Sequence, residues 1–293
     1  MTQRALVLGG GGIVGIAWEA GVIAGLAERG VHLAQAEDVI GTSAGSLVGA
    51  WLAGGRDFGA VAKAQAAPPV AGGSRTPASA SDPGTLARIF RIWTSFERLG
   101  PEQARQLGAL ALAAPTPPEE RSVAWFAREL AHASWPPRLR VTAVDAESGE
   151  LRVFDAESGV PLERAVAASC CVPGIFAPVS IDGRRYVDGG VRSGTSADLA
   201  LASGARQVVV MTPMVRGNAG LARLMQDLLD AEILALREAG AEVVLLTPAR
   251  EDARALGLDF MDPKKRAEAV RLGLEAGRRE AERAELAAWR NQD

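Results

Sequence analysis

The first 55 residues alternate short apolar runs with glycine-rich turns, and this order restricts the fold more than any other feature of the sequence. Ala5 to Leu8 is wholly apolar and ends in four glycines, as is typical of a buried strand in a parallel sheet. Apolar side chains at helical spacing then predict a helix over 16–29, a second strand fits 38–40, and a second helix fits 44–53. This succession predicts an α/β protein.

The rest of the chain contains an interruption and then a return to the same pattern. Residues 66–84 are rich in Pro, Gly, Ser and Ala, which predicts a long loop. The remaining predicted helices cover 85–99, 102–113, 121–133, 162–169, 221–239 and 264–289. The remaining predicted strands cover 139–144, 151–154, 207–211 and 243–246.

Composition excludes several classes of protein. Hydrophobic residues make up 48% of the chain, enough for a sizeable core, and the net charge of −3 argues against a nucleic-acid partner. Cys170 and Cys171 are adjacent, so they do not form a disulfide framework and predict a reducing compartment. The N-terminus resembles a strand and not a signal peptide, and no apolar run approaches the ~20 residues of a membrane span. We therefore expect a cytoplasmic protein.

Gly41 to Gly45 reads Gly-Thr-Ser-Ala-Gly between a predicted strand and a predicted helix. The backbone of so sharp a turn is crowded, which requires glycines such as Gly41 and Gly45 on either side. The turn directs the hydroxyl of Ser43 outward at a helix N-terminus, where amides stabilise negative charge. Ser43 is therefore a candidate nucleophile. The alternative is an ordinary turn with a capping serine.

The glycine run Gly9 to Gly15 has three interpretations. Because glycines have no side chains, their backbone amides can converge on an anion. Gly10, Gly11 and Gly12 are therefore candidates for an oxyanion hole. Gly10, Gly12 and Gly15 also match the dinucleotide-binding fingerprint. That fingerprint expects an acidic residue at the end of the second strand, where this chain has the Gly-Thr-Ser-Ala-Gly motif instead. The third interpretation is a turn that only allows close helix–strand packing.

Histidine is scarce, and this limits the choice of a base for Ser43. The chain has only His32 and His132, and the α/β-hydrolase order would require His132 together with Asp57 or Asp82. Asp57 and Asp82 lie in or near loop-like sequence, and His132 lies beside a helix end. A histidine base is therefore disfavoured, and the base is predicted to be a carboxylate.

Asp188 is the candidate carboxylate, since Asp188, Gly189 and Gly190 form a tight-turn motif after the run Arg185-Tyr186-Val187. A carboxylate in direct contact with the serine hydroxyl can act as the base if burial raises its proton affinity. The alternative is a simple Asp-Gly hairpin turn.

These three motifs, in this order, resemble the patatin-like phospholipases over about residues 4–215. The sequences around Thr142–Glu150 and Ala168–Val179 also look like that family. The resemblance implies a three-layer α/β fold with a mostly parallel central sheet flanked by helices. It also implies a catalytic domain over 4–215 with a helical, cap-like insertion at about 66–135, and we expect a C-terminal α/β extension over 216–293 that packs on it.

The resemblance further implies the chemistry. Ser43 would attack an acyl ester of a phospholipid, lysophospholipid or glycerolipid, with Asp188 as base and Gly10, Gly11 and Gly12 around the oxyanion. The motif-supporting residues would be Gly15, Gly41, Gly45, Gly189 and Gly190. No metal or organic cofactor is implied. The expected partners are a lipid ester and, transiently, a membrane surface; self-association stays open.

Two features of the sequence leave alternatives open. Val14 stands where the family often has Arg or Lys, which could change headgroup preference or mark a catalytically weak member that acts through lipid or protein contacts. An apolar stripe at helical spacing follows the long loop; it is either a core-facing surface or a cap over the acyl pocket. Its residues are Leu86, Ile89, Phe90, Trp93 and Phe96.

Overall fold

A computed structural model describes residues 3–68, 83–131, 133–214, 220–257 and 259–290. Its strands are β1 (Arg4–Leu8), β2 (Asp38–Thr42), β3 (Leu139–Asp145), β4 (Leu151–Phe154), β5 (Val179–Ile181), β6 (Arg184–Asp188), β7 (Gln207–Met211) and β8 (Glu242–Leu246). Its α-helices are α1 (Gly12–Ala27), α2 (Ala44–Ala53), α3 (Phe58–Ala66), α4 (Pro83–Thr94), α5 (Pro101–Ala113), α6 (Glu119–Leu130), α7 (Leu162–Ser169), α8 (Gly220–Glu238), α9 (Arg250–Leu256) and α10 (Arg266–Glu280).

All these strands join one sheet, connected in the order β5-β6-β3-β2-β1-β7-β8, with β4 paired to β3. The strands from β3 to β8 along this order are parallel, whereas β4, β5 and β6 pair antiparallel. Parallel strands need crossover connections, and the helices that provide them cover both faces of the sheet. The mostly parallel sheet flanked by helices agrees with the predicted α/β class.

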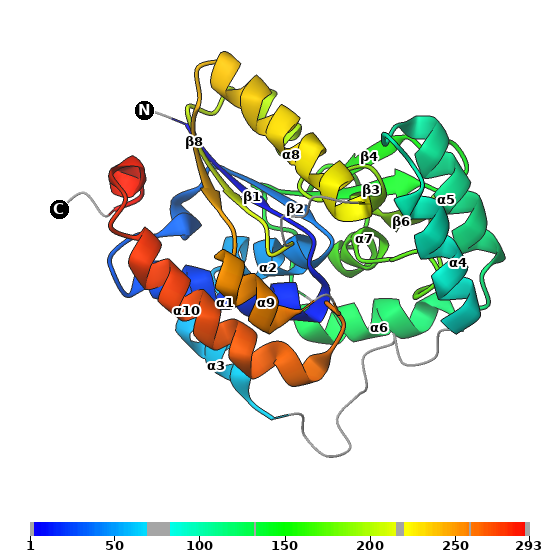
Figure 1. Ribbon diagram of the computed structural model, residues 1–293, viewed down its shortest axis with the longest axis horizontal. Coiled ribbons are helices and arrows are strands. Elements are labelled where there is room, and N and C mark those ends of the chain that lie inside the picture. Colours follow the sequence, from blue (N-terminus) through cyan, green and yellow to red (C-terminus); the bar gives the residue numbers. More distant parts are fainter. Residues whose placement is uncertain (1–2, 69–82, 132, 215–219, 258, 291–293) are drawn as a thin grey trace.

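The two faces of the sheet carry separate apolar cores, because side chains alternate along each strand. Leu6 and Leu8 of β1 pack in the core that includes α1, α2 and α10, while Ala5 and Val7 pack in the core beneath α8. Figure 1 shows α8 on one side of the sheet and α1, α2 and α10 on the other. This arrangement is the predicted three-layer fold.

The pairing register of β3 brings two strand ends together. Thr142 pairs with Thr42 of β2 and with β4, and Ala143 pairs with Asp188 of β6 and with β4. β2 and β6 therefore pair with the same edge of β3, first β2 and then β6 along the strand. β4 pairs with the opposite edge. Since β2 runs parallel to β3 and β6 antiparallel, their carboxyl ends point toward each other. The residue after β2 is Ser43, and the last residue of β6 is Asp188.

The C-terminal region joins the sheet directly through β8, which pairs with β7, and it also makes a close contact between α10 and α1. A Cβ atom on Gly273 would lie 2.3 Å from the carbonyl oxygen of Trp18, and one on Gly25 would lie 2.4 Å from that of Leu274. Glycines on both helices thus let the two backbones touch. The boundary predicted at residue 215 lies outside the described residues, and the division into 4–215 and 216–293 stays a prediction.

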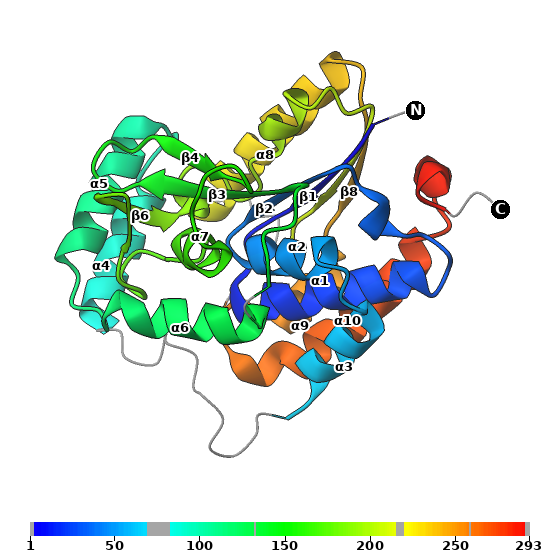
Figure 2. The ribbon, with the colours of Figure 1, turned by 180° about the vertical axis from the view of Figure 1, so that it is seen from behind.

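The helical insertion is present, as α4, α5 and α6. Ile89 and Trp93 of the apolar stripe are buried and pack with α5, β3 and β6, whereas Phe90 is 38% exposed. The stripe therefore faces the core over most of its length, as the first of the two alternatives expects. The predicted loop at 66–84 falls largely on residues 69–82, outside the described residues. Figure 2 shows α6 beneath α7.

Three differences from the sequence prediction have physical causes. The helix predicted over 264–289 ends at Glu280, because Leu286 and Trp289 are buried and the chain must leave the helix axis to place them there. β5 and β6 were not predicted as strands, since each is short and their pairing depends on distant β3. α3 was also missed; the side chain of Asp57 caps it by accepting the Gly59 N–H. Within the described residues, no helix is long and apolar enough to cross a membrane.

Candidate active site

Ser43 occupies a strained turn between β2 and α2. Its backbone has φ 54° and ψ −123°, a conformation that L-residues rarely adopt, and such strain concentrates at functional positions. A Cβ on Gly41 would lie 2.5 Å from Ser46 Cα, and one on Gly45 would lie 2.1 Å from the carbonyl oxygen of Leu8. The two glycines are therefore required by close backbone contact, as the motif predicts.

Ser43 and Asp188 are brought into direct contact. The Ser43 hydroxyl donates a hydrogen bond of 2.8 Å to Asp188 Oδ2, and the Gly190 N–H donates one of 2.7 Å to Oδ1. Both side chains are buried, with 7% of Ser43 and 3% of Asp188 exposed. A nucleophile within hydrogen-bond reach of an oriented base is the geometry that activates serine.

Burial also changes the acid–base behaviour of Asp188. Removal from water raises the pKa of its carboxyl to about 7, against the opposing effect of the hydrogen bonds from Gly190 and Ser43. A base is most effective when its pKa lies near the working pH. Asp188 is therefore suited to accept a proton from Ser43 near neutral pH.

Of the two histidines, only His32 lies within the described residues, and it is not part of this contact. His32 precedes β2, so it lies toward the amino ends of the strands, whereas Ser43 lies at the carboxyl ends. The backbone N–H of His32 donates to the Trp289 carbonyl. His132 lies outside the described residues. The position of Ser43 beside Asp188 agrees with a carboxylate base.

The glycine run passes beside the nucleophile. A Cβ on Gly10 would lie 3.4 Å from Ser43 Cβ. The Gly10 N–H is engaged by the carbonyl oxygen of Gly194, at 2.8 Å. Among the backbone hydrogen bonds of the described residues, none uses the N–H of Gly11 or Gly12. Gly11 and Gly12 therefore stay candidate donors to an oxyanion, while the Gly10 amide fixes the loop in place.

The remaining motif glycines are explained by close packing. A Cβ on Gly15 would lie 2.8 Å from Pro213 Cγ, and one on Gly189 would lie 2.4 Å from Thr142 Oγ1. A Cβ on Gly190 would lie 3.0 Å from the Asp188 carboxylate. These glycines support the shape of the site without supplying reacting groups.

An apolar cavity opens beside Ser43. α6 contributes Trp125 and Phe126, and the C-terminal region contributes Met261. The other lining residues are Gly12, Ile13, Ile16, Ala44, Cys170, Val172 and Phe176. A cavity with almost wholly apolar walls suits a hydrocarbon chain.

The start of α1 is covered by the C-terminal region. The Val14 N–H donates to the carbonyl oxygen of Phe260 at 3.1 Å, and a Cβ on Gly12 would lie 2.6 Å from that oxygen. A phosphate bound at a helix N-terminus needs such amides and the space before them. A carbonyl oxygen in this place disfavours the nucleotide-binding alternative. The Val14 side chain itself is fully buried.

Several residues around the dyad were not identified from the sequence. The Ser169 hydroxyl accepts the N–H of Ser43 at 2.9 Å, and Cys170 Sγ donates to the Ser43 carbonyl at 3.1 Å. Thr42 Oγ1 lies 2.8 Å from Thr142 Oγ1. The family-like stretch beginning at Ala168 was a signal for the first two. Nothing in the sequence pointed to Phe260 or Met261.

Comparison with known proteins places this geometry in a family. A model described as patatin-like phospholipase matches residues 6–201, which is more than half of the chain and includes Ser43, Asp188 and the glycine run. The chain belongs to the patatin-like phospholipase family. Membership in the patatin-like phospholipases supports a lipid hydrolase in general, and the central sheet flanked by helices is the fold expected for the family.

Two solved structures of other proteins are similar to this patatin-like chain. The type III effector protein ExoU matches with 18% identity and a TM-score of 0.46, over 97% of this chain and 53% of that chain. VipD from Legionella pneumophila matches with 16% identity and a TM-score of 0.47, over 96% of this chain and 66% of that chain. This chain therefore spans about half and about two thirds of their respective lengths.

Proposed function

We propose that this protein is a serine acyl-ester hydrolase that acts on lipids, with Ser43 as nucleophile and Asp188 as base. The observation that carries the proposal is the 2.8 Å hydrogen bond from Ser43 Oγ to Asp188, made by a serine on a strained turn beside an apolar cavity. The cavity would hold the acyl chain of a phospholipid, lysophospholipid or glycerolipid. Contact with a membrane surface would deliver such a substrate.

In the proposed acylation step, Asp188 accepts the proton of Ser43 as Oγ bonds to the ester carbonyl carbon. The carbonyl electron pair moves onto its oxygen, where the amides of Gly11 and Gly12 stabilise the charge; one such donor typically contributes about 10²–10³ in rate. Collapse of this intermediate breaks the ester C–O bond. Asp188 then returns the proton to the departing alcohol.

In the proposed deacylation step, water attacks the acyl-enzyme carbonyl and Asp188 accepts its proton. Collapse releases the fatty acid, and the proton passes back to Ser43 Oγ. The proposed reaction needs only side chains and amides of this chain. Among the described residues, no group of three or more His, Cys, Asp or Glu side chains is placed to hold a metal ion.

Labelling with a fluorophosphonate, followed by intact mass measurement, tests this proposal. We expect one adduct on the wild-type protein and none on Ser43→Ala. Ser122→Ala is the matched control, because Ser122 is also buried but its hydroxyl donates to the Glu119 carbonyl within α6. It should be labelled like wild type. A folded wild-type protein that takes no label would contradict the proposal and favour the catalytically weak alternative raised by Val14.

The acyl cavity leads to a second prediction. Trp125→Ala should shift the preferred ester toward longer acyl chains, and Val172→Phe toward shorter ones, because both residues line the cavity. Each methylene gained or lost from apolar contact is worth about 0.8 kcal/mol, or about fourfold in kcat/KM. A series of p-nitrophenyl esters of increasing chain length measures the shift. Because the two shifts are opposite in sign, a general folding defect cannot produce both; unchanged chain-length profiles would exclude this cavity as the acyl site.

A further inference from the structure

A short loop after the dyad aspartate holds both halves of the site together. We define the 193–197 loop as Ser193 to Ala197. The carbonyl oxygen of Gly194 accepts the Gly10 N–H at 2.8 Å, which fixes the glycine run. The carbonyl oxygen of Thr195 accepts the Thr42 hydroxyl at 3.2 Å, one residue before the nucleophile. The loop is therefore bonded to both segments, which also contact each other directly through the Gly45 N–H and the Gly9 carbonyl oxygen, at 3.0 Å.

One buried carboxylate from a distant helix anchors that loop. Glu232 of α8 is 8% exposed, and its Oε1 accepts the Ser193 hydroxyl at 2.6 Å. Its Oε2 accepts the Thr195 hydroxyl at 2.7 Å and the Ala197 N–H at 2.9 Å. Three hydrogen bonds thus join one side chain to three residues of a five-residue loop.

The hydrogen-bond pattern requires an acceptor at position 232. Ser193 Oγ already accepts the N–H groups of Thr195 and Ser196, at 3.2 and 2.9 Å, so its own proton must be donated elsewhere. The Ala197 N–H can only donate. Burial raises the pKa of Glu232, while the bonds from the 193–197 loop lower it. An amide in place of the carboxylate would set an N–H against the Ser193 hydroxyl.

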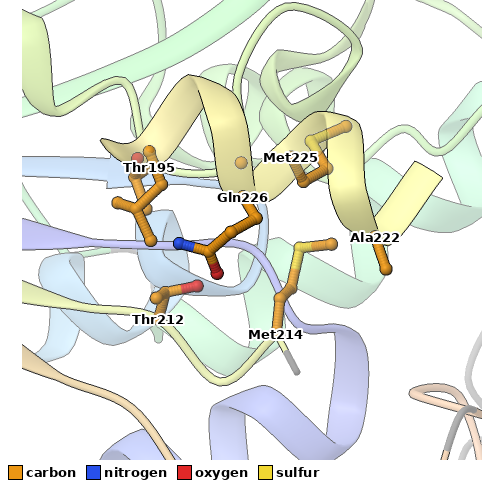
Figure 3. Close-up of a pocket in the computed structure, with 8 residues that line it drawn as sticks. Thr195, Thr212, Met214, Ala222, Met225 and Gln226 are labelled. Atoms are coloured by element: carbon orange, nitrogen blue, oxygen red, sulfur yellow. The ribbon is translucent and has the colours of Figure 1, made fainter. Parts of the chain in front are cut away.

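The 193–197 loop also packs directly on α8. Ala197 is fully buried in the same apolar core as Leu229 and Ile233 of α8. Beside this contact, Gly194, Thr195, Thr212 and Gln226 are among the residues that line a small pocket. Figure 3 shows the Gln226 side chain pointing from α8 toward Thr195 and Thr212. The loop is therefore held to α8 by the packing of Ala197 and by the three hydrogen bonds to Glu232.

We propose that Glu232 is a positioning residue for ester hydrolysis: it holds the 193–197 loop so that Gly194 and Thr195 keep the glycine run and Ser43 in register. This inference rests on the proposed function. Glu232 lies beyond residues 6–201, the part matched by the family model. It touches neither Ser43 nor Asp188 through any hydrogen bond of the described residues, so it acts through the loop.

Kinetics of Glu232→Gln test the proposal. A displacement of about 1 Å in a reacting group can cost about 10²-fold in rate, so we expect kcat on a p-nitrophenyl ester to fall about 10- to 100-fold. KM should change less than about threefold, because the acyl cavity is not part of the loop. The rate of fluorophosphonate labelling should fall in parallel. Leu236→Ala is the control: Leu236 is buried on the same helix, and its loss should lower stability while kcat stays within about threefold.

A double-mutant cycle separates positioning from general destabilisation. Thr195→Val removes one hydroxyl donor to Glu232 and keeps the side-chain volume. If both residues act through the same bond, Thr195→Val should cost much less kcat in the Glu232→Gln background than in wild type. Should Glu232→Gln fail to fold, Thr195→Val alone must still lower kcat without raising KM.

The outcomes distinguish this inference from the proposed function. If the folded wild-type protein takes no fluorophosphonate label, both the proposed function and the positioning role of Glu232 are contradicted. Normal labelling and turnover by the wild type, with kcat of Glu232→Gln and Thr195→Val within about threefold of it, would overturn the positioning role and leave the Ser43–Asp188 proposal intact. A loss of kcat matched by Leu236→Ala would also overturn it.

Discussion

Asp188→Asn is expected to lower kcat/KM for ester hydrolysis by about 10²–10⁴-fold, the range that a positioned general base contributes. The amide keeps the size of the side chain but cannot accept the Ser43 proton. Labelling of Ser43 by the fluorophosphonate should slow in parallel. Asp145→Asn is a suitable control, because Asp145 is equally buried but pairs with Arg184 and not with Ser43. Full activity in Asp188→Asn would show that the base lies elsewhere.

The raised pKa of Asp188, about 7, predicts the pH dependence of the wild-type enzyme. The base must be ionised to accept a proton, so kcat/KM should be low under acidic conditions and rise with pH through about 7. The pH profile of kcat/KM, which reports groups of the free enzyme, measures this inflection. The same inflection should be missing from the residual activity of Asp188→Asn.

The raised pKa of Asp188 also predicts how the stability of the fold depends on pH: stability should fall as pH rises, whereas kcat/KM should increase. Folding favours the protonated form of Asp188, so this stabilisation is complete below its ordinary pKa of 3.8 and is lost as pH rises through about 7. Asp188→Asn removes a buried charge above that pH. We therefore expect the Tm of the variant relative to wild type to be higher at pH 8 than at pH 5. An unchanged difference would contradict the burial of this charge.

Gly273→Val is expected to have the largest effect on folding. Even a Cβ at this position would lie 2.3 Å from the Trp18 carbonyl, so a larger side chain must push α10 away from α1. Overpacking typically costs about 1–3 kcal/mol and more where backbone must move. We expect a loss of at least about 3 kcal/mol in the free energy of unfolding, measured by urea denaturation. Because α1 begins at the glycine run, activity should fall as well.

Gly59→Ala provides the control for glycine replacement in a helix. Gly59 lies on the exposed side of α3, and a Cβ there would approach only the flexible Asp57 carboxylate among the described residues, at 3.2 Å. Replacing glycine by alanine inside an open helix usually changes stability by less than about 1 kcal/mol. If Gly273→Val were tolerated equally well, the contact between α1 and α10 would not be as close as the structure has it.

The local parts of the site could be read from the sequence because their causes are local. Gly41 and Gly45 flank Ser43 since any side chain there would meet neighbouring backbone. The alternation of apolar runs and helical spacing likewise predicted most strands and helices, because each follows from which side chains must be buried. Asp188 was proposed only through its motif and the scarcity of histidine.

The tertiary structure decided which distant residues meet. Ser43 and Asp188 come together because β2 and β6 follow one another along β3, and that antiparallel pairing leaves no periodic signal near Asp188. Late in the chain, Glu232 bonds to the 193–197 loop beside the site, and the Phe260 carbonyl oxygen accepts the Val14 N–H at the start of α1. The sequence by itself determined the shape of the serine turn and the class of fold, since both follow from steric contact and burial within short segments. Apart from Asp188, which its motif and the scarcity of histidine indicated, the partners of that turn were assigned only by the tertiary structure, since their contacts join residues more than a hundred positions apart.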